Sequence, residues 1–97
     1  MADNVKHVLI VEDDDLISGM YQAALAGSGF DLRVVKDGEL GWEAMQTTTP
    51  NLVILDFMLP KLNGIEILAK MRAVERLQAV PAIIMTSLTS DADKKRA

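Results

Sequence analysis

Two continuous apolar runs constrain the fold of this 97-residue chain more than any other feature of its sequence. Residues 8–11 and 52–55 contain only Val, Ile and Leu, and each run has the length and β-branched content of a short strand. Runs of this kind are typical of strands that are buried on both faces, as in parallel sheets covered by helices. Each run stops abruptly at acidic residues, which are residues 12–14 after the first run and Asp56 after the second.

The rest of the chain alternates between segments that favour strands and segments that favour helices. We expect strands at about residues 6–11, 30–35, 51–56 and 80–86. The segment 30–35 alternates apolar and polar residues, which indicates a half-buried strand at an edge of the sheet. Strands that alternate with helices at this spacing along the sequence predict parallel βαβ units with right-handed crossovers, and therefore an α/β fold.

Apolar residues at helical spacing predict the inward faces of three helices between these strands. The first face contains Leu16, Met20 and Ala24, with Ile17, Tyr21 and Leu25 beside them. The second contains Leu40, Ala44 and Met45. The third contains Ile67, Leu68, Met71, Val74 and Leu77. The methionines Met20, Met45 and Met71 are interpreted as core-filling side chains rather than as a binding surface.

The composition indicates one small globular domain and excludes several classes of function. Hydrophobic residues make up 49% of the chain and charged residues 25%, which disfavours disorder. The net charge of −4 disfavours direct contact with nucleic acid. Cysteine is absent, no apolar stretch approaches the ~20 residues needed to cross a bilayer, and the first residues do not resemble a signal peptide. We therefore expect a cytoplasmic protein without a membrane partner.

The acidic residues that follow the two apolar runs predict a metal site. If the first and third strands are neighbours in a parallel sheet, Glu12, Asp13 and Asp56 meet at its carboxyl edge, where open α/β sheets place their sites. Clustered carboxylates repel one another unless a hard cation or protons neutralise them, which suggests a Mg²⁺ site. Thr86 ends the fourth strand and adds a hydroxyl to the same edge. Carboxylates, a cation and a hydroxyl donor together suit a phosphoryl group attached to Asp56.

At these positions the chain resembles the receiver domain of two-component response regulators. The resemblance covers nearly the whole chain, and the matching stretches follow the family's order and spacing. They are residues 8–14 (VLIVEDD), 37–38 (DG), 52–60 (LVILDFMLP), 63–64 (NG) and 81–86 (PAIIMT). The resemblance implies a flavodoxin-like, doubly wound parallel sheet, with its strands here in the order 2-1-3-4.

The resemblance also implies a role for each residue of the site. Asp56 resembles the phosphoacceptor that takes a phosphoryl group from a histidine kinase or a phosphotransfer protein. Glu12 and Asp13 resemble the acidic pair that binds Mg²⁺, and Met58 occupies the position whose backbone carbonyl completes the metal shell. Thr86 resembles the switch hydroxyl that bonds the phosphoryl group. Such a domain is a conformational switch rather than a turnover enzyme.

One departure from the family pattern lies at the carboxyl end. We interpret residues 1–97 as a single receiver domain that lacks the family's fifth strand, its last helix and the lysine that pairs with the phosphoryl group. An alternative function follows, in which the chain is phosphorylation-deficient and acts only through protein association. The fourth strand would then be an exposed apolar edge, through which we expect a homodimer or an oligomer that exchanges elements between protomers.

Two further alternatives concern the acids themselves. Residues 12–15 could act only as caps and charge at a helix start, which we expect of Asp15. An aspartyl-phosphate phosphohydrolase would also use a strand-ending aspartate, but such enzymes want a second acid two residues later, where this chain has Met58.

Overall fold

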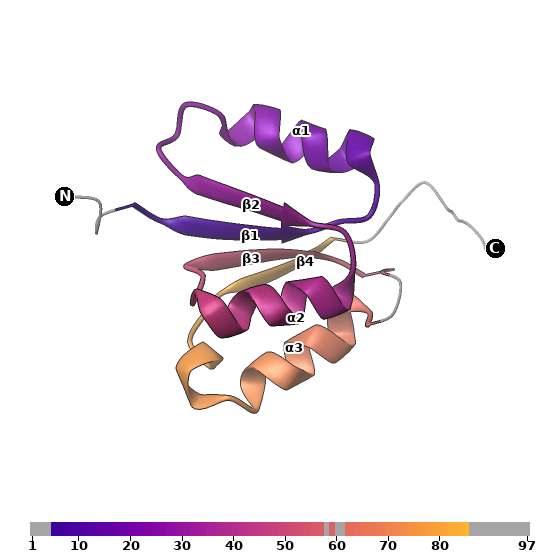
Figure 1. Cartoon of the computed structure of the whole chain (residues 1–97), viewed down its shortest axis with the longest axis vertical. Coiled ribbons are helices and arrows are strands. Elements are labelled where there is room, and N and C mark those ends of the chain that lie inside the picture. The colour runs from indigo at the N-terminus through magenta and orange to yellow at the C-terminus, as the bar shows by residue number, and fades with distance from the viewer. Residues whose placement is uncertain (1–4, 58, 60–61, 86–97) are drawn as a thin grey trace.

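The computed structural model describes residues 5–57, 59 and 62–85. Within them the chain forms one sheet from the strands β1 (His7–Val11), β2 (Asp31–Val35), β3 (Leu52–Asp56) and β4 (Ala82–Met85) (Figure 1). All neighbouring strands are parallel, and the order across the sheet is β2-β1-β3-β4. This order and the edge position of β2 confirm the predicted doubly wound, flavodoxin-like fold.

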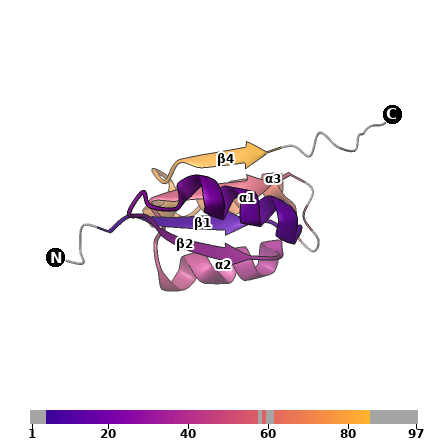
Figure 2. The same cartoon turned by 90° about the horizontal axis from the view of Figure 1, so that it is seen from above.

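Helices cover both faces of this sheet. The helix α1 (Asp15–Leu25) lies on one face, whereas α2 (Gly38–Thr47) and α3 (Gly64–Arg72) lie on the other (Figure 1). Figure 2 looks onto the sheet from the side of α1. A short 3₁₀ helix, η2 (Glu75–Leu77), leads from α3 toward β4. None of the helices in the described residues has the length and apolar character that a membrane span requires.

A side chain just before each α-helix fixes where the helix begins. Asp14 and Asp37 accept backbone N–H groups of α1 and α2, respectively. Asn63 accepts the Glu66 N–H, and the Glu66 carboxylate accepts the Asn63 N–H, both at 2.9 Å. This reciprocal pair is a capping box, which satisfies two donors at the start of α3. All three α-helices therefore begin next to the carboxyl ends of strands.

The hydrophobic core is divided unequally between the two faces of the sheet. The larger cluster lies under α2 and α3 and contains Leu9, Val11, Ala44, Met45, Val53, Leu55, Leu59, Ile67, Met71, Leu77 and Val80. The smaller cluster lies on the α1 face and contains Val8, Ile10 and Ile54, with Tyr21 packed against it. Both apolar runs are therefore buried on two faces, as predicted.

The prediction that Met20 fills the core is wrong, because its side chain is 62% exposed. Helix α1 turns Ile17, Ser18 and Tyr21 toward the sheet, and the stripe that contains Leu16 and Met20 faces outward. Met45 and Met71 are fully buried, in agreement with the prediction.

The predicted long helix before β4 is also shorter in the structure. It ends at Arg72, and Val74 has an extended backbone (φ −110°, ψ 122°) before η2 begins. After the break, the Arg72 guanidinium donates hydrogen bonds to the carbonyls of Leu77, Gln78 and Val80 at 2.8–3.1 Å. These bonds stabilise a compact turn, and Leu77 still reaches the core.

Candidate phosphoacceptor and metal site

The pairing of β1 with β3 brings the predicted acids to one edge of the sheet. Val11 lies opposite Leu55 in the parallel register, so the next residues, Glu12 and Asp56, emerge side by side. Carboxylate oxygens of Glu12, Asp13 and Asp56 all lie within 4.8 Å of one another. The convergence predicted from the sequence is therefore present.

The three carboxylates differ in their exposure. Glu12 is 3% exposed and Asp56 is 7% exposed, whereas Asp13 is open to solvent. The backbone holds Glu12 in place, because its N–H donates to the Val35 carbonyl at 3.0 Å. Its side-chain oxygen Oε2 accepts the N–H of Asp14 at 3.1 Å. The site thus has two acids on a buried floor and one at its rim.

This concentration of negative charge changes the protonation of Glu12. The pKa of Glu12 is raised from 4.5 to about 7, and burial of the carboxyl is the largest cause. The charge of Asp56, a hydrogen bond with the Asp56 side chain and the charge of Asp13 contribute to the rise, while the Asp14 N–H opposes it. Near neutral pH the Glu12 carboxyl is therefore protonated for part of the time, unless a cation replaces the proton.

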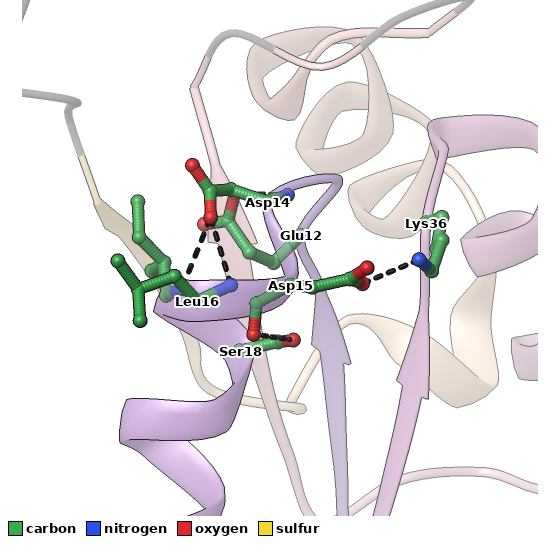
Figure 3. A network of polar contacts seen from close by, with 7 residues as sticks. Glu12, Asp14, Asp15, Leu16, Ser18 and Lys36 are labelled. Atoms are coloured by element: carbon green, nitrogen blue, oxygen red, sulfur yellow. Dashed lines mark hydrogen bonds and ion pairs between the residues drawn. The ribbon is translucent and has the colours of Figure 1, made fainter.

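The neighbouring acids have structural roles (Figure 3). Asp14 Oδ1 accepts the N–H groups of Leu16 and Ile17 at 2.9 and 3.2 Å, which makes Asp14 the N-cap of α1. Asp15 forms an ion pair with Lys36, and its carbonyl accepts the Ser18 hydroxyl. Asp14 is therefore a helix cap, and Asp15 is a charged residue in the first turn of α1, as expected. Glu12 and Asp13 belong to the acidic cluster instead.

Two residues lie next to the site although the sequence analysis gave them no role in it. A Cβ added to Gly64 would lie 2.8 Å from the backbone carbonyl oxygen of Asp56, and the Gly64 N–H donates to the Phe57 carbonyl at 3.3 Å. Only glycine allows α3 to begin this close to the end of β3. The Asn63-Gly64 pair is visible in the sequence, but the close approach of Gly64 to Asp56 appears only in the folded structure.

Tyr21 is the second such residue, and it approaches from the α1 face. Burial raises the pKa of its phenol, and the negative charges of Glu12 and Asp56 raise it further. The phenol therefore stays protonated beside the acids. Its place on the inward stripe of α1 was the only signal in the sequence.

The predicted positions Met58 and Thr86 lie outside the described residues. Their roles in the metal shell and in switching remain predictions. The described donors are three carboxylates, which are hard oxygen ligands suited to Mg²⁺ or Mn²⁺. A divalent cation would offset the repulsion that raises the pKa of Glu12.

Known proteins resemble this chain in both sequence and fold. The family model for the response regulator receiver domain matches residues 8–97. The DNA-binding response regulator MtrA of Mycolicibacterium smegmatis is 36% identical over 88 residues, which cover 91% of this chain and 37% of MtrA. The chain thus spans little more than a third of the length of that curated relative.

Two crystal structures of receiver proteins share the fold. The Mn²⁺-bound form of response regulator Rcp1 has a TM-score of 0.77 and 31% identity, and the match covers 84% of this chain and 65% of Rcp1. The receiver domain of sensor histidine kinase PA1611 from Pseudomonas aeruginosa PAO1 has a TM-score of 0.80 and 26% identity, over 92% of this chain and 73% of that domain. That structure is described as holding a magnesium ion in its active site cleft.

Proposed function

Because this chain belongs to the response regulator receiver domain family, we propose that it accepts a phosphoryl group on Asp56 in a Mg²⁺-dependent reaction. Receiver domains are signalling modules of two-component systems that interact with histidine kinases or phosphotransfer proteins. The donor proposed here is the phosphohistidine of such a partner. The cysteine-free composition supports the cytoplasm as the compartment.

The observation that carries this proposal is the meeting of Glu12, Asp13 and Asp56 from two separate strands. An isolated strand-ending aspartate has many structural uses. Three carboxylates within 4.8 Å, two of them buried, repel one another and gain from a divalent cation. The Mn²⁺ and Mg²⁺ in the two structural relatives support the same kind of ligand here.

In the proposed reaction, an ionised oxygen of Asp56 attacks the phosphorus of phosphohistidine. The O–P bond forms as the P–N bond breaks, and the imidazole keeps the electron pair and takes a proton from solvent. A divalent cation held by Glu12, Asp13 and Asp56, with the Met58 carbonyl as a further ligand, would supply positive charge beside the transferring oxygens.

The protein itself positions the reacting groups. The buried β1–β3 register fixes Glu12 beside Asp56, and Gly64 allows α3 to start against the Asp56 backbone. We propose that Thr86 then bonds the phosphoryl oxygen. The added charge would shift the population between two surface arrangements and so control an output.

Intact mass spectrometry after incubation with Mg²⁺ and acetyl phosphate tests the proposal. We expect the mass of one phosphoryl group on the wild-type chain, none on Asp56→Asn, and a full gain on Asp31→Asn, a matched change at the opposite end of the sheet. Chelation of Mg²⁺ should abolish the gain. A phosphoryl group on the Asp56→Asn variant, or no gain on the wild-type chain, would contradict the proposal.

A further inference from the structure

The sequence Asn63-Gly64 occurs once in this chain, and the structure places it at the start of α3. An asparagine that precedes glycine is chemically reactive, because no side chain on the glycine blocks its backbone nitrogen from approaching the asparagine amide. Attack of this nitrogen closes a five-membered succinimide ring and releases ammonia. Water then opens the ring to aspartate or isoaspartate. The Asn63-Gly64 pair is therefore a candidate site of spontaneous modification.

In the folded chain, the capping box of α3 holds Asn63 in an unreactive conformation. The Asn63 side-chain oxygen accepts the Glu66 N–H at 2.9 Å, and the Glu66 carboxylate accepts the Asn63 N–H at the same distance. The backbone of Asn63 is extended, with ψ at 171°. This angle keeps the Gly64 nitrogen out of the alignment with the Asn63 Cβ that closure of the ring requires. Both the side chain and the backbone of Asn63 must therefore rotate before the ring can form.

The attacking nitrogen is also held in place by the fold. The Gly64 N–H donates to the Phe57 carbonyl at 3.3 Å, and Gly64 is buried. A Cβ at this position would lie 2.8 Å from the Asp56 carbonyl oxygen, so the start of α3 is packed closely against the end of β3. The nitrogen becomes free to attack only when the first turn of α3 moves away from β3. Such local openings occur more often at helix ends than in a buried core.

We propose that Asn63 deamidates when the start of α3 opens, and that the capping box sets the rate of this reaction. The Gly64 nitrogen loses its proton to solvent and attacks the Asn63 Cγ. The new N–Cγ bond forms as the Cγ–Nδ2 bond breaks, and Nδ2 takes a proton and leaves as ammonia. Water then adds to one of the two ring carbonyls. Addition at Cγ restores the normal main chain and gives aspartate, whereas addition at the backbone carbonyl carbon gives isoaspartate.

The two products should have different effects on the structure beside the acidic cluster. Aspartate keeps a side-chain oxygen that can accept the Glu66 N–H, and its negative charge suits a helix start. Isoaspartate carries the main chain through Cβ and Cγ, which adds one methylene before Gly64. Because Gly64 is packed against the Asp56 backbone, the longer main chain would push α3 away from the end of β3. We therefore expect isoaspartate, but not aspartate, to destabilise the chain.

Peptide mapping by mass spectrometry, after ageing of the chain in mildly alkaline buffer, tests the proposal. We expect the amide of Asn63 to be lost about tenfold or more faster in urea than in the folded chain. Without urea, Glu66→Ala should raise the rate about fivefold or more, because one bond of the capping box is lost. Glu66→Gln keeps an acceptor oxygen and should stay close to the wild type. The control Glu43→Ala, at an exposed position of α2, should leave the rate unchanged.

Gly64→Ala in urea tests the ring mechanism without any contribution from folding. The alanine methyl group hinders the nitrogen, so the amide of Asn63 should be lost more slowly than in the wild type in urea. Far-UV circular dichroism verifies that the Glu66 variants are folded in buffer. Equal rates for the wild type with and without urea, or a folded Glu66→Ala no faster than Glu43→Ala, would overturn the proposal. A Gly64→Ala rate equal to the wild-type rate in urea would overturn the ring mechanism. Neither phosphodonor nor metal is needed, so the result is independent of the proposed function.

Discussion

The protonation of Glu12 makes a quantitative prediction about stability without metal. The pKa of Glu12 is about 7 in the folded chain, against an ordinary value of 4.5. Between these two values the folded state binds more protons than the unfolded state, so the free energy of unfolding falls as the pH rises. Above pH 7 the folded chain must keep an ionised Glu12 beside Asp56 and Asp13. The shift corresponds to at most about 3 kcal/mol of lost stability.

The substitution Glu12→Gln removes that penalty and keeps the shape of the side chain. The amide oxygen can still accept the Asp14 N–H, and the amide N–H can donate to Asp56. With EDTA present, we expect the variant to be more stable than the wild type by about 2–3 kcal/mol at pH 8. The difference should shrink toward zero near pH 4, where the wild-type carboxyl is protonated in both states.

Urea denaturation, followed by circular dichroism from pH 4 to pH 8, measures this difference. Glu43→Gln is the control, because Glu43 is an exposed residue in the middle of α2. The control should show no comparable pH-dependent gain. If the gap between Glu12→Gln and the wild type were the same at pH 4 and pH 8, the electrostatic account of the cluster would be refuted.

Three other predictions follow from the same geometry. Mg²⁺ should raise the melting temperature of the wild-type chain more at pH 8 than at pH 5, because protons compete with the metal for the same carboxylates. It should not stabilise Asp56→Asn, and equal shifts of the melting temperature at both pH values would argue against this site. Gly64→Ala should destabilise the chain by about 1–3 kcal/mol in urea denaturation, because the new Cβ would lie 2.8 Å from the Asp56 carbonyl oxygen. The control Gly19→Ala has open space around it in α1 and should be neutral or stabilising. Met71→Ala should cost about 2–5 kcal/mol because Met71 is fully buried, while Met20→Ala should change stability by less than about 0.5 kcal/mol; similar values for the two methionines would contradict the assigned core.

The sheet and the convergence of its acids were predictable because strong local signals set them. The apolar runs at residues 8–11 and 52–55 require burial on both faces, and parallel pairing then places Glu12 and Asp56 at one edge. The alternation of residues 30–35 likewise indicated the edge strand β2. These inferences depend on periodicity and on strand direction, which a sequence shows directly.

The features that were not predictable depend on packing between elements and on side-chain hydrogen bonds. Leu16 and Met20 have helical spacing, but only the tertiary packing of α1 decides which stripe faces the sheet. The turn after Arg72 is stabilised by one guanidinium that donates hydrogen bonds to three carbonyls of that turn. The closeness of Gly64 to the Asp56 carbonyl also appears only when β3 and α3 are in place. Helical periodicity contains none of this information.

The most direct test of the central claim locates the phosphoryl group on the chain. Hydride reduction converts an aspartyl phosphate to homoserine, so peptide mapping after treatment with acetyl phosphate identifies the modified position. We expect homoserine at residue 56 with Mg²⁺ present, and none when EDTA replaces the metal. Homoserine at Asp13 or elsewhere in place of Asp56, or equal modification of Asp56 without a divalent cation, would contradict the claim that Glu12, Asp13 and a cation together make Asp56 the acceptor.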